Sequence, residues 1–203
     1  GNPPDHETIL PFTRLMGGPM DYTPGIFQTK VSHYKPGNPN MVHTTLVKQL
    51  ALYVTMSSPV QMAADLIENY EQHLDAFQFI EDVAVDWDDT KILEAEPGDY
   101  ITEARKAKGK DEWYLGAITD ENTRTAVAPL NFLEAGKNYV ATLYLDGDKA
   151  HWNDNPMEYQ IQKFIVNSKS ILKLKLAAGG GAAVSLKLAS DNDAKKLKKY
   201  IVK

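Results

Sequence analysis

The pattern of apolar and polar positions changes near residue 88. Before that point, apolar residues recur three and four positions apart, which is typical of helices packed on one side. After it, they alternate with polar residues or form short runs between turn signals, which is typical of β-strands. We therefore divide the chain into residues 1–87, residues 88–189 and a charged tail at residues 190–203, which is expected to form a short helix.

The opening segment is rich in proline and glycine. Its apolar run from Ile9 to Met16 stops at the Gly-Gly-Pro of residues 17–19. A short apolar run bounded by such residues predicts a buried strand followed by a loop. The loop at residues 18–25 contains two prolines and two glycines, so we expect packing or a ligand to hold it.

Three helices are predicted before residue 88. One runs from Met41 to Met56 with Asn40 as its N-cap. The next begins at Ser58, with proline at the first helical position and Gln61 completing a capping box. The third runs from Leu74 to Val83. The side chains expected to face the core from these helices are Val42, Leu46, Leu50, Tyr53, Met62, Leu66, Tyr70, Phe77, Phe79 and Ile80.

Eight short strands are predicted beyond residue 88. Their clearest member is residues 171–176, where isoleucine and lysine alternate strictly with leucine. Strands at this spacing, separated by glycine-rich and aspartate-rich turns, predict an antiparallel β-sandwich and an α+β chain overall. The expected strands are Thr90–Ala95, Asp99–Lys106, Glu112–Thr119, Thr123–Pro129, Asn138–Asp146, Glu158–Val166, Ile171–Leu176 and Ala182–Ala189.

Composition excludes several classes of protein. The net charge is −5, and the one basic run, Lys195 to Lys199, is typical of a solvated tail, so we do not expect nucleic-acid binding. The chain has no cysteine, which excludes disulfides and thiolate metal sites. No stretch approaches the roughly 20 apolar residues that span a bilayer. Because the chain does not begin with Met, we expect it to be internal to a longer protein.

Several blocks of residues resemble one family of enzymes. His6–Arg14, followed by Gly18–Gly25, resembles the segment that closes the catalytic (β/α)₈ barrel in glycoside hydrolase family 97. Further blocks are similar to the C-terminal sandwich of that family. They are Trp87–Thr90, Gly98–Tyr100, Trp113–Ala117 and Leu176–Gly181. The resemblance extends to about Ala189, and its first block is the most specific.

The resemblance implies the helical remnant of the end of a (β/α)₈ barrel, followed by the sandwich. It also implies an α-glycosidase for α-linked glucose or galactose, exported by a Gram-negative bacterium, mostly to the periplasm. Such enzymes use a pair of carboxyl groups, and this family binds calcium close to the sugar. The family's proton-donating glutamate lies in a motif like Arg-Gly-Met-Glu-Tyr, upstream of the segment that matches Asn2–Pro4.

That motif is absent from this chain, so we expect no catalytic residue and no calcium site within it. The oligosaccharide substrate would bind through the missing barrel. The chain alone should be inactive, with its sandwich supporting the barrel in the intact enzyme. We also expect apolar side chains to be exposed where the rest of the barrel packs, which favours self-association.

Three residues are candidates for contact with substrate. In a barrel, active-site groups lie at the C-terminal ends of the strands, which by the resemblance is where Arg14, Asp21 and Tyr22 fall. Arg14 or Asp21 would contact sugar hydroxyls, and Tyr22 would stack on the sugar or wall the pocket. The alternative is that Arg14 and Asp21 pair with each other or bond to the loop backbone. The aspartates at 86, 88 and 89 are expected to form a turn, because the glycine and glutamate of an EF-hand are missing.

Two other functions remain open at this point. A non-catalytic carbohydrate-binding sandwich would present an exposed aromatic platform, for which Trp113, Tyr114 and Trp152 are the available residues. Trp113 and Tyr114 are adjacent on a strand, so one is expected to face the core and the other to face outward. A structural interaction module would account for the helices and the sandwich, but not for the specific first block.

Overall fold

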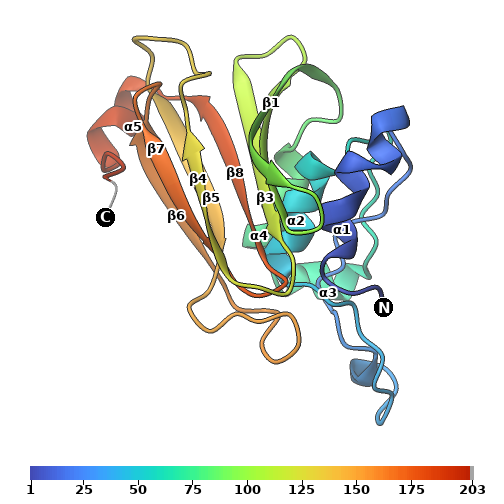
Figure 1. Cartoon of the computed structure of the whole chain (residues 1–203). Coiled ribbons are helices and arrows are strands. Elements are labelled where there is room, and N and C mark those ends of the chain that lie inside the picture. The colour runs from blue at the N-terminus through green and yellow to red at the C-terminus, as the bar shows by residue number, and fades with distance from the viewer. Residues whose placement is uncertain (202–203) are drawn as a thin grey trace.

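A computed structural model describes residues 1–201 of the chain. Figure 1 shows a central sheet with helices against one face and two strands against the other. The N-terminus and the C-terminal helix lie on opposite sides of this sheet. The helical elements are α1 (His6–Ile9), η1 (Leu10–Phe12), η2 (Arg14–Gly17), η3 (Val31–His33), α2 (Leu46–Thr55), α3 (Ile67–Glu71), α4 (Leu74–Asp82) and α5 (Asp191–Lys196).

The eight predicted strands are confirmed, with bounds that shift by a few residues at most. They are β1 (Trp87–Glu96), β2 (Tyr100–Ala107), β3 (Glu112–Thr119), β4 (Arg124–Pro129), β5 (Tyr139–Asp146), β6 (Tyr159–Val166), β7 (Ile171–Leu176) and β8 (Gly181–Leu188). Six strands form one sheet in the order β1-β2-β3-β8-β5-β6, and β4 pairs with β7 in a second. All these pairings are antiparallel. The chain is therefore an α+β protein built on an antiparallel sandwich.

The central strand β3 separates two hydrophobic cores because successive side chains point to opposite faces. Trp113 and Leu115 pack against the β4–β7 sheet, in a core that includes the leucines of β7. Tyr114 and Ile118 pack against the helices. The predicted alternation in β7 is confirmed, since its three leucines are buried while Ile171, Lys173 and Lys175 are exposed.

Helix α2 is wholly buried and lies on β3 and β8. A Cβ atom on Gly116 would lie 2.7 Å from the carbonyl oxygen of Ala51, so glycine permits this close approach. The prediction that this helix begins at Met41 with Asn40 as N-cap was wrong. Met41 instead forms a β-bridge with Lys30, and the cap is Thr45, whose hydroxyl accepts a hydrogen bond from the Lys48 amide.

The prediction of a buried strand at Ile9–Met16 was also wrong. This segment forms α1, η1 and η2, with local bonds such as Thr13 N to Leu10 O and Met16 N to Thr13 O. Pro11 fits a helical turn because its ring fixes a helical φ and its missing N–H is not needed at a helix start. Ile9 and Met16 are exposed, so the apolar run does not enter a core as a strand.

The prediction of a helix beginning at Ser58 was wrong as well. The Ser58 hydroxyl accepts a bond from the Val60 amide in a tight turn, and Gln61 forms a parallel β-bridge with Tyr22. The helix begins only at Ile67, and Met62 and Leu66 are exposed while Tyr70 is buried. The third helix is confirmed as α4, although Phe79 is its fully buried aromatic residue and Phe77 and Ile80 are partly buried.

The C-terminal tail begins as the predicted short helix, but only α5 is helical. Residues after it extend along the sandwich, where Lys199 forms a parallel bridge with Ile165. The remainder of the predicted tail, residues 202 and 203, lies outside the described part. The longest helix among residues 1–201 is α2, with ten residues, so none of these helices could cross a membrane.

Candidate functional site

Two short extended segments flank α2 and pair in parallel. The bridge between Tyr22 and Gln61 is extended by bonds from Met20 N to Ser57 O and from Ala64 N to Pro24 O, both 3.2 Å. Residues 20–24, α2 and residues 57–64 therefore form a strand–helix–strand unit. The carbohydrate-contact candidates Asp21 and Tyr22 lie in its first extended segment. They were predicted to follow a strand at Ile9–Met16, which the structure does not contain.

The third candidate, Arg14, is exposed in η2, and its Nη1 donates to the carbonyl oxygen of Gly18 at 3.3 Å. Arg14 and Asp21 form no ion pair within residues 1–201. The structure therefore favours the alternative in which Arg14 bonds to the loop backbone. Asp21 is exposed on the loop that follows.

The half-buried Tyr22 is tied to a buried ion pair that the sequence did not predict. Its hydroxyl donates to Glu7 Oε1 at 3.4 Å, and Lys48 Nζ lies 3.3 Å from Glu7 Oε2. Burial and the neighbouring Glu7 carboxylate both raise the pKa of Tyr22, so its hydroxyl stays protonated. Tyr22 is therefore held as a hydrogen-bond donor to Glu7.

Lys48 joins the opening segment to the sandwich. Its side chain is fully buried, and its ammonium group donates to the carbonyl oxygens of Pro4 at 2.5 Å and Thr119 at 3.0 Å. Burial lowers the pKa of Lys48, and Glu7, Asp120 and Asp146 oppose that shift. Two carbonyl oxygens thus accept hydrogen bonds from the ammonium group. Glu7 supplies the opposite charge, although its Oε2 accepts no hydrogen bond.

Asp146 lies on the sandwich side of the same junction and is also buried. One of its carboxylate oxygens accepts bonds from the amides of Ala177 and Gly181, both at 2.9 Å. Burial raises the pKa of Asp146 to about 6, although these two bonds and Lys48 act in the opposite direction. Asp146 thus fixes the glycine-rich turn between β7 and β8 against the start of α2.

Two side chains hold the loop that leaves the first extended segment. Gln49 Oε1 accepts from the amides of Gly25 and Ile26, and Asp65 Oδ2 accepts from those of Phe27 and Gln28. The sequence predicted that this loop needs such ties but did not identify them. Each of these bonds joins residues that are far apart in the sequence, so no local pattern reveals them.

An apolar hollow of about 350 Å³ separates residues 11–19 from β1 and β2. Glu103 lies in its wall and is almost fully buried, with Arg105 Nη2 3.0 Å away. Arg105 Nε also donates to the Val54 carbonyl oxygen at 2.8 Å, which links β2 to α2. Burial raises the pKa of Glu103 to about 7 against the opposing effect of Arg105.

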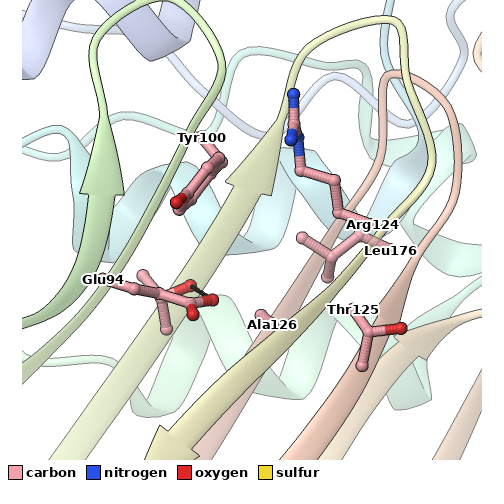
Figure 2. Close-up of a pocket in the computed structure, with 7 residues that line it drawn as sticks. Glu94, Tyr100, Arg124, Thr125, Ala126 and Leu176 are labelled. Carbon is pink, nitrogen blue, oxygen red and sulfur yellow. Dashed lines mark hydrogen bonds between the residues drawn. The ribbon is translucent and has the colours of Figure 1, made fainter.

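A second hollow, of about 270 Å³, lies between the β1–β2 hairpin and β4 (Figure 2). The guanidinium carbon of Arg124 is 4.9 Å from the ring centroid of Tyr100, a cation–π contact. Arg124 also pairs with Asp99 and Asp120. Glu94 Oε1 accepts from the Val127 amide at 3.1 Å and from the Thr102 hydroxyl at 3.3 Å. These polar groups bond to one another and to the backbone. The residues that line the hollow therefore connect the two sheets.

The aromatic residues considered for a carbohydrate platform are not arranged as one. Trp113 and Tyr114 are both buried, at 4% and 1% exposure, so the expectation that one faces outward was wrong. Both faces of the six-stranded sheet are covered, one by helices and one by β4 and β7. Trp152 is half-buried, packs edge-on to His43 and covers Gly179.

The prediction that the aspartates after α4 form a turn is confirmed only for Asp86, because Asp88 and Asp89 lie within β1. Asp86 pairs with Lys108 at 2.7 Å, Asp88 accepts from the Gly109 amide, and Asp89 pairs with Lys91. Within residues 1–201, no group of three or more histidine, aspartate or glutamate side chains is placed to hold a metal ion.

Comparisons with known proteins agree with this architecture. The model of the family "Glycosyl-hydrolase 97 C-terminal, oligomerisation" matches residues 86–187. A retaining α-galactosidase from Bacteroides thetaiotaomicron is 37% identical over 184 residues, which are 90% of this chain and 27% of that protein. A probable retaining α-galactosidase from Streptomyces bingchenggensis is 31% identical over 182 residues, 90% of this chain and 26% of that protein.

Among solved structures, a family 97 glycoside hydrolase from Pseudoalteromonas sp. strain K8 in complex with acarbose is 47% identical, with a TM-score of 0.88. The match covers 93% of this chain and 29% of that one. The fold and these matches define the C-terminal region of a glycoside hydrolase. The chain belongs to glycoside hydrolase family 97. It spans about a quarter of the length of the curated relatives that it matches.

Proposed function

We propose that the chain is the C-terminal part of an exported bacterial α-glycosidase, with a sandwich that supports the catalytic barrel. The observation that carries this proposal is the strand–helix–strand unit at residues 20–64. Parallel strands joined by a helix are the repeating unit of a (β/α)₈ barrel, and one such unit cannot close a barrel alone. The unit belongs beside further strands of the parent protein.

Exposed apolar side chains support this placement. Met16, Val60 and Met62 lie on or beside the strand–helix–strand unit and are 78%, 60% and 47% exposed. We call these three side chains the barrel-facing surface. In the parent enzyme the preceding barrel segments would cover it. In the chain by itself it favours self-association, because uncovered apolar area tends to find a partner.

The buried junction explains how the sandwich would support the barrel. Lys48 on α2 contacts Glu7 and Pro4 in the opening segment and Thr119 on β3. The segment that leads into the first strand is therefore fixed directly to the sandwich. On the resemblance, Asp21 and Tyr22 of this segment would contact the sugar or wall its pocket in the intact enzyme.

The chemistry itself would come from upstream residues. The acid and the base or nucleophile of a glycosidase are two carboxyl groups on either side of the scissile bond. The resemblance places both, together with the calcium ligands, before Gly1. We therefore propose that calcium and the oligosaccharide bind the intact enzyme, in the periplasm or outside a Gram-negative cell. The α-galactosidase relatives support α-galactosides as substrates, with α-glucosides as the other candidates.

Hydrolysis assays test this proposal. The purified chain and the parent enzyme would be incubated with p-nitrophenyl α-galactoside and p-nitrophenyl α-glucoside, with calcium present. We expect turnover of at least one substrate by the parent enzyme and none above the buffer rate by the chain. Turnover by the chain itself would contradict the upstream placement of the carboxylates, and a parent enzyme inactive on both substrates would contradict the assigned reaction.

A further inference from the structure

The charges of this chain are separated along the sequence. Residues 159–203 contain ten of the 22 basic residues but only two of the 27 acidic ones, a net charge of +8. The preceding 158 residues therefore carry −13. Within that part, residues 49–90 contain nine aspartates and glutamates and no lysine or arginine. A molecule with a net charge of only −5 thus carries two strongly charged regions of opposite sign.

Four lysines of the basic region lie on one face of the sandwich, whereas Lys187 pairs with Asp82 on the side of the helices. Lys173 and Lys175 point outward from β7, while Lys198 and Lys199 lie on the extended tail. The tail is held there by bonds from Ile165 N to Lys198 O and from Tyr200 N to Ile165 O. We call these four residues the lysine face. Figure 1 shows β7 and α5 beside the β6 edge of the sheet, away from α1–α4.

Three residues of the lysine face line an apolar hollow. Lys173, Lys198 and Lys199 line a cavity of about 590 Å³ together with Phe164, Tyr200 and Ile201. Beside it, Val127 and Ile171 are 42% and 43% exposed on the outer side of β4 and β7. Among residues 1–201, only Lys175 of this face forms an ion pair, with Asp148 at 3.7 Å. The surface therefore fits a partner that is acidic and carries apolar side chains.

The acidic region of the same chain has that chemistry. Glu68 and Glu71 lie on one side of α3, at the i, i+3 spacing that places side chains together. Ile67 and Leu74 beside them are 73% and 62% exposed. Both glutamates are exposed, and the salt bridges among residues 1–201 do not include them. We call these four residues the α3–α4 acidic patch.

We propose that the lysine face of one chain binds the α3–α4 acidic patch of a second copy. Residues 86–187, which include Lys173 and Lys175, match a family model described as an oligomerisation domain, and this supports a second copy as the occupant. A contact of the lysine face with itself is disfavoured, because like charges facing each other repel. The contact is therefore heterologous, with two different surfaces of the same chain meeting head to tail. The barrel-facing surface takes no part in it.

Sedimentation velocity on the 203-residue chain, from about 1 to about 100 μM, tests this contact in the range of transient interfaces. We expect a larger average mass at about 50 mM salt than at about 0.5 M, since exposed charges are screened over a few ångströms at the higher concentration. Lys173→Glu with Lys198→Glu should remove this salt-dependent association. Lys35→Glu with Lys110→Glu makes the same change in net charge elsewhere and should leave it intact.

A mixing experiment separates this contact from every other mode of association. Glu68→Lys with Glu71→Lys should also remove the salt-dependent association, because it removes the other half of the interface. Each double variant keeps the half that the other lacks, so an equimolar mixture should recover the association that each variant alone has lost. Circular dichroism on each variant establishes that it is folded.

Four results would overturn the proposal. They are a wild-type chain that is monomeric at low salt, association that is equally strong at about 50 mM and about 0.5 M salt, double variants that associate like wild type, and a mixture that associates no more than its two components. Persistence in salt would assign the association to the barrel-facing surface, since apolar contacts are not screened. A monomer that sediments with phosphatidylglycerol vesicles would assign the lysine face to anionic lipid. None of these results bears on the proposed hydrolase activity, which the substrate assays test separately.

Discussion

Lys48 Nζ and Glu7 Oε2 lie 3.3 Å apart in a site where the lysine side chain is fully buried and the glutamate side chain is 11% exposed. The pair connects α2 with the opening segment, and Thr119 on β3 completes the coordination of the ammonium group. A buried ion pair contributes little net stability compared with apolar residues of the same size, but removal of one partner is costly. Its main effect here is to fix the opening segment in one position on the sandwich.

Replacement of Lys48 by Met should destabilise the chain by about 3–5 kcal/mol, because it leaves Glu7 buried without a counter-charge. The free energy of unfolding would be measured by urea titration monitored by circular dichroism. Lys169→Met, at an exposed turn, is the control and should change stability by less than about 0.5 kcal/mol. Adding Glu7→Leu to Lys48→Met should recover part of the loss. If the single variant is as stable as the control, the ion pair does not fix the opening segment.

Replacement of Gly25 by alanine tests how closely the loop after the first extended segment is packed. Its φ is +94°, and a Cβ atom there would lie 2.5 Å from the Tyr53 hydroxyl. Gly37 has a similar φ of +81°, but a Cβ atom there would meet nothing within 4 Å. Both alanine variants should lose about 1 kcal/mol from the backbone. Gly25→Ala should lose about 1–3 kcal/mol more from overpacking, and equal losses in urea titrations would contradict the described packing.

The sandwich was predictable from the sequence because its signals are local. Alternation in β7 and the turn glycines place strand ends within a few residues, and no distant contact is needed to recognise them. The assignment of Trp113 and Tyr114 failed for a different reason. Alternation says that the two side chains point to opposite faces, but not that both faces are covered. That requires knowing that α2 packs on the sheet opposite β4 and β7.

The opening part was harder to predict because distant residues determine its structure. Residues 20–24 and 57–64 become strands by pairing with each other across α2, and neither has an alternating pattern of its own. Lys48 looks like a solvent-facing helix position. Its burial depends on Pro4 and Thr119, which are 44 and 71 residues away in sequence. Positions of this kind are recognisable only once the fold is known.

The tail is expected to contribute to stability through Tyr200. Its hydroxyl accepts a bond from the Lys173 amide at 3.1 Å, and its ring meets Phe164 edge-on at a centroid distance of 5.4 Å. Tyr200→Phe should cost about 1 kcal/mol through the lost hydrogen bond. Tyr200→Ala should cost about 1–2 kcal/mol more through the lost ring contact and apolar burial. Urea titration measures both, and two equal losses would indicate that the ring contributes nothing.

Because of Glu103, the free energy of unfolding of the chain is expected to fall as the pH rises. Its pKa is raised by burial from 4.5 to about 7, so the folded state holds a proton that the unfolded state releases. Stability from this group is complete below pH 4.5 and is lost as the pH rises through about 7. The shift corresponds to roughly 3 kcal/mol at 1.36 kcal/mol per unit.

The measurement is the free energy of unfolding in urea at intervals from pH 4.5 to pH 8, for wild type, Glu103→Gln and the exposed control Glu81→Gln. Glu103→Gln should make the decline smaller by the contribution of Glu103, because glutamine keeps the shape of the protonated side chain and cannot ionise. Glu81→Gln should decline as wild type does. Asp146, whose pKa burial raises to about 6, contributes a similar decline at lower pH, and its contribution should persist in both variants. If the three curves were parallel, the Arg105 ion pair would be stabilising Glu103 as a carboxylate, and burial would not be the dominant effect on this group.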